Sequence, residues 1–231
     1  FLSNYSEKKV VAIMGGHGLK RDEAGFFEIA LLSKKLTEAG YLMMSGGGPG
    51  AMEATHVGAW FAGKSDLLLE QACLTLSQAP EYKHPLWLDK ALEVLAMHPE
   101  AQYESVGIPT WHYGHEPSTP FATKIAKYFE NSIREEGLLS VAKGGIIFTP
   151  GSAGTLQEIF QEAVQNHYLI FGYASPMIFF NKSYWTEYFP VVPFFRQMIQ
   201  EEKYKNLIFS VYDSSVEIIE ELNRFSENCC D

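Results

Sequence analysis

Cysteine, basic charge and long apolar stretches are all scarce in this sequence. Its 231 residues include only three cysteines, Cys73, Cys229 and Cys230. An odd and sparse set provides no disulfide framework, and the spacing matches no zinc motif. No run of about 18 apolar residues occurs, so the sequence predicts no membrane-spanning helix. We therefore expect a cytoplasmic protein with no membrane partner, because reducing compartments keep thiols free.

Lysine and arginine are outnumbered by acidic residues, 18 against 28, which gives a formal net charge of -10. Binding to DNA or RNA requires clustered basic side chains that neutralise phosphates, so we expect no nucleic-acid partner. A small phosphorylated ligand is still compatible with this charge. Backbone N–H groups and one or two cations suffice to hold a single phosphate.

The common nucleotide-binding and metal-binding signatures are also missing. The turn formed by Gly15, Gly16, His17 and Gly18 is a poor match to the dinucleotide fingerprint G-x-G-x-x-G. Neither glycine-rich turn, at 45–50 or at 150–155, is followed by Lys-Ser or Lys-Thr, so neither is a Walker A loop, which disfavours a kinase or ATPase. The histidines lack a metal-binding spacing such as H-E-x-x-H, so we expect no metal site.

Short apolar segments typical of buried strands alternate with segments of helical periodicity. This alternation predicts an α/β fold of Rossmann-like type, a doubly wound parallel sheet with helices on both faces. We expect a single domain over residues 1–231 with a helical insertion at 64–102, whose two helical patterns cover 67–76 and 86–96. The expected strands are 9–14, 41–44, 104–108, 144–148, 176–180 and 207–211, and the other expected helices are 24–39, 51–62, 119–139, 154–164, 184–201 and 214–225.

Two glycine-rich turns each follow an expected strand and precede an expected helix. One is Ser45–Gly50 and the other is Pro150–Thr155. Both should lie at the carboxyl edge of the sheet, where open α/β folds bind ligands. Glycine admits a close phosphate, and the helix start that follows offers unpaired N–H groups and partial positive charge. The alternative is tight packing of strand, turn and helix, without a ligand.

Four polar side chains are candidates for chemistry, and each has a plain structural alternative. Glu158 could cap its helix, or it could place a carboxylate one turn from a bound phosphate. Arg134 lies in a helix, where arginine is usually a solvated surface residue. Tyr113 and His115 lie in a loop expected to reach the ligand edge, although any one histidine could be structural.

The segments SGGGPGAMEA (45–54) and PGSAGTLQE (150–158) together resemble the Lonely Guy family, long labelled as lysine decarboxylases. That family carries P-G-G-x-G-T-x-x-E, preceded by a G-G-G-x-x-G turn. The resemblance covers roughly residues 9–63 and 103–213, and longer bacterial nucleotide nucleosidases look closer across 113–117 and 126–129. No pyridoxal-phosphate lysine site is recognisable, so the old label finds no support in the sequence.

The resemblance implies a phosphoribohydrolase that cleaves a nucleoside 5′-monophosphate into free base and ribose 5-phosphate, with no cofactor required. Glu158 matches the family's catalytic Glu, and Arg134 falls at the Arg of its M-H-x-R-K helix. The resemblance also implies a homodimer that pairs through helices near the site. The AMP-like ligand is expected to contact Gly15, Gly16, Gly46, Gly47, Gly48, Gly50, Tyr113, His115, Asn131, Gly151, Ser152, Ala153, Gly154 and Thr155.

Both motifs depart from the family pattern. Ser152 replaces the second glycine of the phosphate motif, and residues 131–135 keep only the arginine of M-H-x-R-K, with Glu135 in place of the lysine. The second change reverses a charge near the expected site. It keeps open an alternative function, a non-catalytic nucleotide sensor or cofactor carrier. A nicotinamide-dependent oxidoreductase is disfavoured because the dinucleotide fingerprint is absent.

Overall fold

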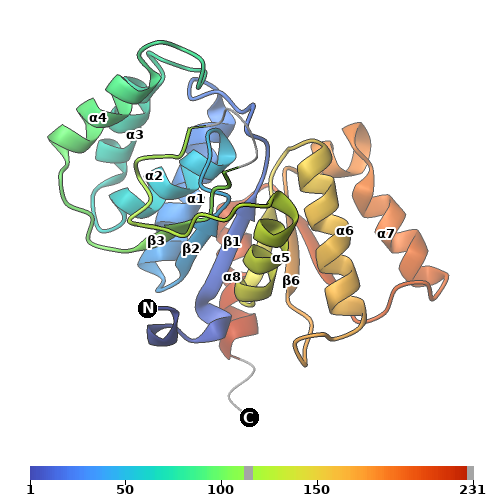
Figure 1. Ribbon diagram of the computed structural model, residues 1–231. Helices are drawn as coiled ribbons and strands as arrows, with labels where there is room; N and C mark the ends of the chain where they lie inside the picture. Colours follow the sequence, from blue (N-terminus) through green and yellow to red (C-terminus); the bar gives the residue numbers. More distant parts are fainter. Residues whose placement is uncertain (112–116, 228–231) are drawn as a thin grey trace. The chain divides into compact units, whose positions relative to one another are not determined.

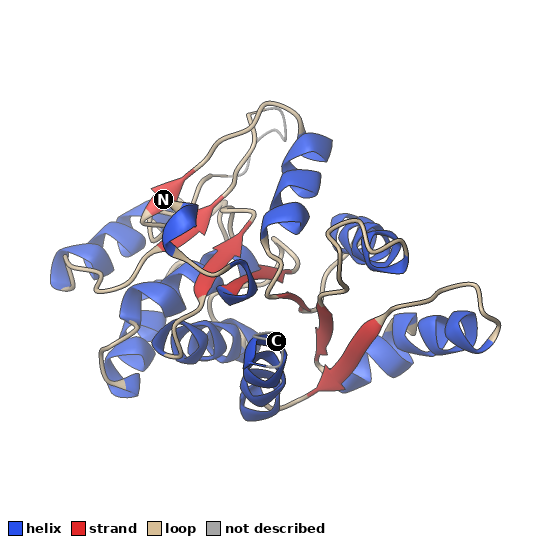
Figure 2. Cartoon of the chain, turned by 90° about the horizontal axis from the view of Figure 1, so that it is seen from below, coloured by secondary structure: helices blue, strands red, loops and turns tan. Residues whose placement is uncertain are grey.

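The computed structural model describes residues 1–111 and 117–227, and it shows two compact units. The terminal unit comprises residues 1–15 and 139–231, and the central unit comprises residues 16–138. Each unit contains parallel strands and helices, and Figure 2 shows the strands flanked by helices. No helix among the described residues is long and apolar enough to cross a membrane.

The terminal unit contains four parallel strands in the order β1-β5-β6-β7. Their bounds are β1 Val10–Met14, β5 Gly145–Phe148, β6 Pro176–Phe180 and β7 Ile208–Tyr212. Every residue of β1, β5 and β6 is buried. A parallel strand covered on both faces must be apolar throughout, which explains the continuous runs VVAIM, GIIF and PMIFF.

Three helices of the terminal unit follow its strands, namely α6 Ala153–His167, α7 Val191–Gln200 and α8 Ser215–Glu227. Two 3-10 turns, Leu2–Asn4 and Glu7–Lys9, precede β1. The helix expected over 184–201 is wrong in one respect. A π-helical turn, Tyr184–Tyr188, is separated from α7 by Phe189 and Pro190. Pro190 disfavours helical backbone at the preceding residue, so the segment breaks there.

The central unit contains three parallel strands in the order β4-β3-β2, with β2 Leu42–Ser45, β3 Ser105–Gly107 and β4 Lys124–Ile125. Helices α1 (Ala24–Glu38) and α2 (Ala51–Phe61) pack closely together. Gly58 permits this approach, because a Cβ there would overlap the carbonyl oxygen of Ala30. Figure 1 shows α1 and α2 beside the insertion helices α3 (Asp66–Leu76) and α4 (Trp87–Met97).

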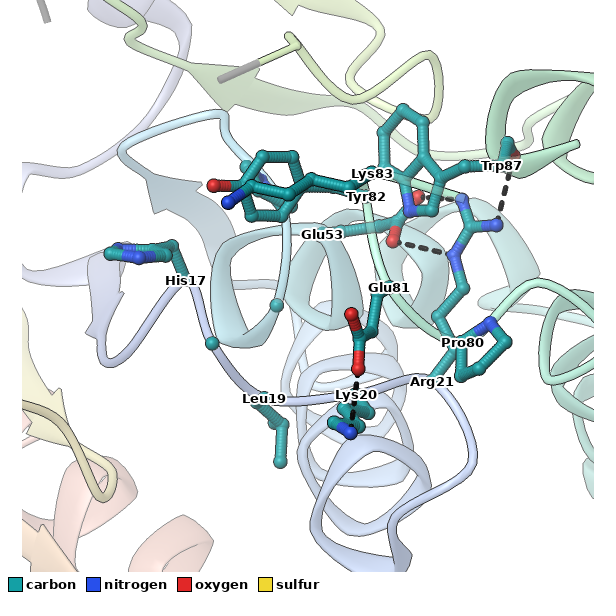
Figure 3. A pocket seen from close by; sticks show the side chains of 13 residues that line it. His17, Leu19, Lys20, Arg21, Glu53, Pro80, Glu81, Tyr82, Lys83 and Trp87 are labelled. Carbon is teal, nitrogen blue, oxygen red and sulfur yellow. Dashed lines mark hydrogen bonds and ion pairs between the residues drawn. The ribbon is translucent and has the colours of Figure 1, made fainter. Parts of the chain in front are cut away.

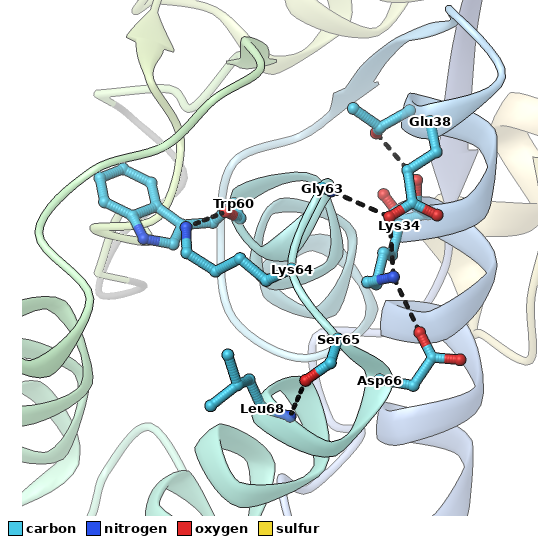
Figure 4. A network of polar contacts seen from close by, with 10 residues as sticks. Lys34, Glu38, Trp60, Gly63, Lys64, Ser65, Asp66 and Leu68 are labelled. Carbon is cyan, nitrogen blue, oxygen red and sulfur yellow. Dashed lines mark hydrogen bonds and ion pairs between the residues drawn. The ribbon is translucent and has the colours of Figure 1, made fainter.

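Polar contacts fasten the start of the insertion to α1 (Figure 4). Lys34 Nζ lies 2.7 Å from Glu38 Oε1 and 2.8 Å from Asp66 Oδ1, at the first residue of α3. The backbone N–H of Gly63 donates to the same Glu38 carboxylate at 2.9 Å. Ser65 caps α3 by accepting a hydrogen bond from the N–H of Leu68. The expected helical insertion is therefore present and begins at a defined cap.

The long helix expected over 119–139 is wrong in its first half. Residues 124 and 125 form β4, which pairs with β3, and α5 begins only at Asn131 and ends at Val141. The N–H of Ala126 donates to Gly107 O, and that of Tyr128 donates to Pro109 O. Pairing with a neighbouring strand thus replaces the local helical preference of this segment.

Candidate functional site

The Pro150–Thr155 turn of the terminal unit connects β5 to the start of α6. Ser152 occupies the N-cap position, but its side chain forms no capping hydrogen bond. The first N–H groups of a helix have no partner within the helix, so an uncapped start presents them to an anion. A Cβ built on Gly154 meets no atom within 4 Å. Packing within the described protein therefore does not require glycine here, whereas a closely bound ligand would.

Tyr184 supports this turn, and the sequence did not identify it as a site residue. Its hydroxyl donates to the carbonyl oxygen of Gly151 at 2.6 Å. Thr149, at the end of β5, donates both its N–H and its hydroxyl to Met14 O. These bonds tie the turn to β1 and to the π-helical segment. No local pattern could have revealed Tyr184, because it lies more than thirty residues away in the chain.

Glu158 is buried on α6, with 6% of its surface exposed. The helix starts at Ala153, so Glu158 lies in the second turn and the first turn holds no acidic residue. The expectation that Glu158 lies in the first turn as a helix cap is therefore wrong. A catalytic role for this buried carboxylate stays a prediction.

The Ser45–Gly50 turn of the central unit has structural reasons for its glycines. A Cβ on Gly46 would overlap Arg134 Nη1 and Met52 Sδ. Gly47 and Gly50 adopt positive φ angles of 69° and 71°, and a Cβ on Gly50 would overlap the backbone of Gly16 and His17. Packing within the central unit thus accounts for these three glycines. Contact of this turn with a ligand stays a prediction.

A buried histidine orders the same turn. His56 Nε2 lies 2.8 Å from Ser45 Oγ, and His56 Nδ1 lies 2.9 Å from Ser105 Oγ. Ser45 Oγ also accepts the N–H of Gly47 at 3.1 Å. Burial lowers the pKa of His56 to about 3, so the ring is neutral at physiological pH. All three side chains are fully buried, which makes this group structural rather than a nucleophilic triad.

Arg134 is buried near Gly46 rather than solvated, with 9% of its surface exposed. Its Nη2 donates to Asn131 Oδ1 at 2.6 Å and lies 3.6 Å from Glu135 Oε1. Asn131 in turn donates to Glu135 Oε1 at 2.7 Å. Arg134 Nε and Glu135 Oε2 are buried without a hydrogen-bond partner among the described residues. The residue that departs from the family pattern, Glu135, therefore compensates the charge of Arg134.

The structure brings together some expected site residues within each unit. In the central unit, Asn131 and Arg134 lie at the Gly46 end of the glycine turn. At its other end, Gly16 O accepts the N–H of Ala51 at 3.2 Å. In the terminal unit, Gly15 follows β1, while Gly151–Thr155 and Glu158 share the β5–α6 connection. Tyr113 and His115 lie outside the described residues.

The central unit also contains a cavity of about 290 Å³ beside Pro49 and Gly50 (Figure 3). Arg21 and Glu53 form a buried bidentate ion pair in its wall, with N···O distances of 2.9 and 2.6 Å. Arg21 Nη1 donates to Trp87 O at 2.9 Å, and the guanidinium lies 4.3 Å from the Trp87 ring centroid. This pair joins the helix after the glycine turn to the insertion.

Parallel strands, glycine turns and an open helix start are characteristic of a Rossmann-like ligand-binding α/β protein. The family model described as "Possible lysine decarboxylase" matches residues 91–222, which is more than half of the chain. The chain belongs to this family, as the two glycine motifs predicted. The match begins within α4, so it includes the later part of the insertion.

Solved structures of similar fold confirm the Rossmann-like class. The molybdenum cofactor binding protein from Rippkaea orientalis is 14% identical, with a TM-score of 0.57, and the match covers 94% of this chain and 96% of that one. A structure named TM1055 is 18% identical, with a TM-score of 0.59 and coverage of 94% and 99%. The Moco carrier protein of Chlamydomonas rheinhardtii is 13% identical, with a TM-score of 0.53 and coverage of 94% and 96%. No curated protein matches the sequence.

Proposed function

We propose that this protein is a nucleoside 5′-monophosphate phosphoribohydrolase, which hydrolyses the N-glycosidic bond to release free base and ribose 5-phosphate. The observation that carries the proposal is the uncapped start of α6, which is open at Gly154 and lies one turn before buried Glu158. Membership of the family supports the same class of activity. The proposed reaction requires no cofactor.

In this proposal the phosphate binds the N–H groups at the start of α6. Fixing the phosphate there turns binding energy into positioning of the ribose. Hydrolysis passes through an oxocarbenium-like ribose, so a carboxylate near the anomeric carbon stabilises developing positive charge. Glu158 would also orient or deprotonate the attacking water. Its burial strengthens both effects, because charges interact more strongly away from bulk water.

Arg134 has a different role in the proposal. Asn131 and Glu135 already occupy its Nη2 side, so its charge is largely compensated. A compensated guanidinium attracts a dianionic phosphate weakly, but it still donates hydrogen bonds. We therefore assign Arg134 to ligand oxygens or to the departing base.

The alternative function is a nucleotide sensor or cofactor carrier without chemistry. The Arg134–Glu135 ion pair is the observation that favours it, because the family pattern has a lysine at that position and this chain has a compensating acid. Two of the structural neighbours are named as a molybdenum cofactor binding protein and a Moco carrier. A carrier would bind the phosphate of its ligand at the open start of α6, and Glu158 would not catalyse hydrolysis of that ligand.

The test is to incubate the protein with AMP, GMP, IMP, CMP and UMP and to separate products by chromatography. The proposal predicts free base and ribose 5-phosphate in equal amounts from at least one nucleotide. Glu158→Gln should reduce turnover at least a hundredfold and leave nucleotide affinity within a few-fold, because general acid–base groups typically contribute about 10²–10⁴-fold. Measurable binding with no base release from any nucleotide would favour the carrier instead.

A further inference from the structure

The cavity beside Pro49 and Gly50 has one wall from the β1–α1 connection and another from the insertion (Figure 3). Residues 17–21 form the first wall, and residues 80–83 with Trp87 form the second. All of these residues belong to the central unit. Residues 77–86 connect α3 to α4, and residues 80–83 of this wall lie in that connection. The insertion thus completes a cavity next to the glycine turn.

Flat rings lie among charged side chains in the walls. Tyr82 and His17 face each other at right angles, with ring centroids 6.2 Å apart and an interplanar angle of 81°. Pro80 and Leu19 also line the cavity, and Trp87 closes it from the insertion side. Aromatic faces and edges of this kind stack against planar heterocycles. The cavity therefore suits a flat ring better than a flexible chain.

The charged groups of the cavity differ in how freely they can meet a ligand. Arg21 and Glu53 are occupied with each other and with Trp87 O, so they form a rigid wall. Lys20 and Glu81 form an ion pair of 2.6 Å across the two walls, and both side chains are about half exposed, at 47% and 52%. Exposed pairs of this type contribute roughly 0–1 kcal/mol, so a ligand can readily exchange with it.

A lysine ammonium beside a glutamate carboxylate presents a hydrogen-bond donor next to an acceptor. Nucleobases carry the complementary pattern, a ring nitrogen or keto oxygen beside an amino group. The volume of about 290 Å³ lies near the lower end of the roughly 300–1,000 Å³ typical of small-molecule sites. It is therefore large enough for one ring system.

We propose that this cavity binds the base of the nucleotide and that the insertion sets the base preference. The proposal rests on the proposed function, since it places the base at the Gly50 end of the turn whose Gly46 end contacts Arg134. The base stacks on the Tyr82 ring, and Lys20 and Glu81 form hydrogen bonds with the edge of the base. Base recognition then comes from residues 80–87, outside the two glycine motifs.

Calorimetric titrations of AMP, adenosine, inosine and ribose 5-phosphate test this assignment. Tyr82→Ala should weaken AMP and adenosine binding about tenfold, in line with the loss of one stacking partner, and leave ribose 5-phosphate binding unchanged. Glu81→Gln should reduce the preference for adenosine over inosine, because the carboxylate accepts from the amino group. Leu88→Ala is the matched control on α4, since Leu88 is 49% exposed and does not line the cavity.

Each outcome separates this inference from the proposed function. If Tyr82→Ala keeps its melting temperature and binds AMP as tightly as the parent protein, base recognition lies elsewhere and the inference is wrong. Adenosine binding that depends on Tyr82, without hydrolysis of any of the five nucleoside monophosphates, would support the base site and refute the hydrolase. A parent protein that binds none of these four compounds at millimolar concentration would overturn both.

Discussion

Buried ionisable side chains are the residues whose environment most affects the stability of this protein. Glu53, His56 and Glu162 are almost completely buried, and a different local contact stabilises each of these side chains. Glu53 is paired with Arg21, His56 stays neutral between two hydroxyls, and Glu162 accepts a hydrogen bond from Ser175. A buried charge without a partner costs several kcal/mol, so each solution is open to test by substitution.

Glu162 should make stability fall as pH rises towards neutral. Burial raises its pKa to about 7, against hydrogen bonds from Ser175 and Asn166 that lower it. The folded state therefore keeps a proton that the unfolded chain releases above about pH 4.5. This contribution is complete at low pH and is lost at about 1.4 kcal/mol per unit as pH rises to 7.

Urea unfolding of the parent protein and of Glu162→Gln at pH 5, 6, 7 and 8 measures this effect. Gln cannot ionise, so the stability of the parent relative to the variant should fall by about 2–3 kcal/mol between pH 5 and pH 8. Other titrating groups affect both proteins alike and cancel in the difference. A difference independent of pH would show that the Glu162 pKa is not raised in the folded state.

Substituting one partner of the Arg21–Glu53 pair should destabilise the protein more than substituting both. Glu53→Gln leaves the buried Arg21 guanidinium without its counter-charge and should reduce the free energy of unfolding by about 3–5 kcal/mol. The double variant Arg21→Met, Glu53→Leu removes both charges and should be more stable than Glu53→Gln. Chemical denaturation of the parent protein and the two variants measures this, and a double variant no more stable than Glu53→Gln would contradict a coupled buried pair.

At the scale of elements, the two glycine turns differ in what requires their glycines. In the Ser45–Gly50 turn, the side chains and backbone of the central unit fill the space that a Cβ would take. At Gly154, on α6, that space is empty. The comparison assigns a packing role to the first turn and favours ligand contact at the second. The sequence predicted ligand contact for both turns.

A matched pair of substitutions separates the two roles. Gly154→Ala should keep or raise stability, by up to about 1 kcal/mol, because alanine is the better helix former and meets no neighbour. The same change should weaken binding of a nucleoside monophosphate at least tenfold, since the methyl group occupies the proposed phosphate position. Gly46→Ala should instead lower stability, because its Cβ overlaps Arg134 Nη1 and Met52 Sδ. Thermal melts and calorimetric binding distinguish these outcomes; unchanged phosphate affinity in Gly154→Ala would contradict the proposed site.

Most elements could be predicted because their residues are buried on both faces of a parallel strand or on one face of a helix. The strand expected at 176–180 matches β6 at both ends, and the insertion helices lie within a residue or so of their expected ranges. The failures lie where distant contacts decide the structure. Pairing with β3 converts residues 124–125 into a strand, and the contact of Tyr184 with Gly151 has no local signature.

At the scale of the whole molecule, the homodimer stays a prediction, and exposed aromatic side chains of the terminal unit indicate which surface would form its interface. Phe194, on α7, is 40% exposed, whereas Trp185 and Phe195 are buried. Phe194 packs edge-on against Phe160 of α6, which is itself 37% exposed. Exposed apolar clusters of this kind on helices near a site are typical of subunit interfaces.

Sedimentation velocity tests this prediction. The parent protein should sediment as a dimer, and Phe194→Asp should shift it to a monomer, because the variant places a charge in the apolar interface. Phe129→Asp is the control, since Phe129 is exposed but belongs to the central unit and not to the cluster on α6 and α7. A parent protein that stays monomeric at micromolar concentration would contradict the expected assembly.

The most direct test of the central claim is a crystal structure of Glu158→Gln with AMP bound. We predict the phosphate at the N–H groups of residues 153–155 and the ribose next to residue 158. Phosphate density at the start of α6, with the introduced glutamine side chain beside the anomeric carbon, would establish the hydrolase geometry. Phosphate bound at any other place, or residue 158 remote from the ribose, would contradict it.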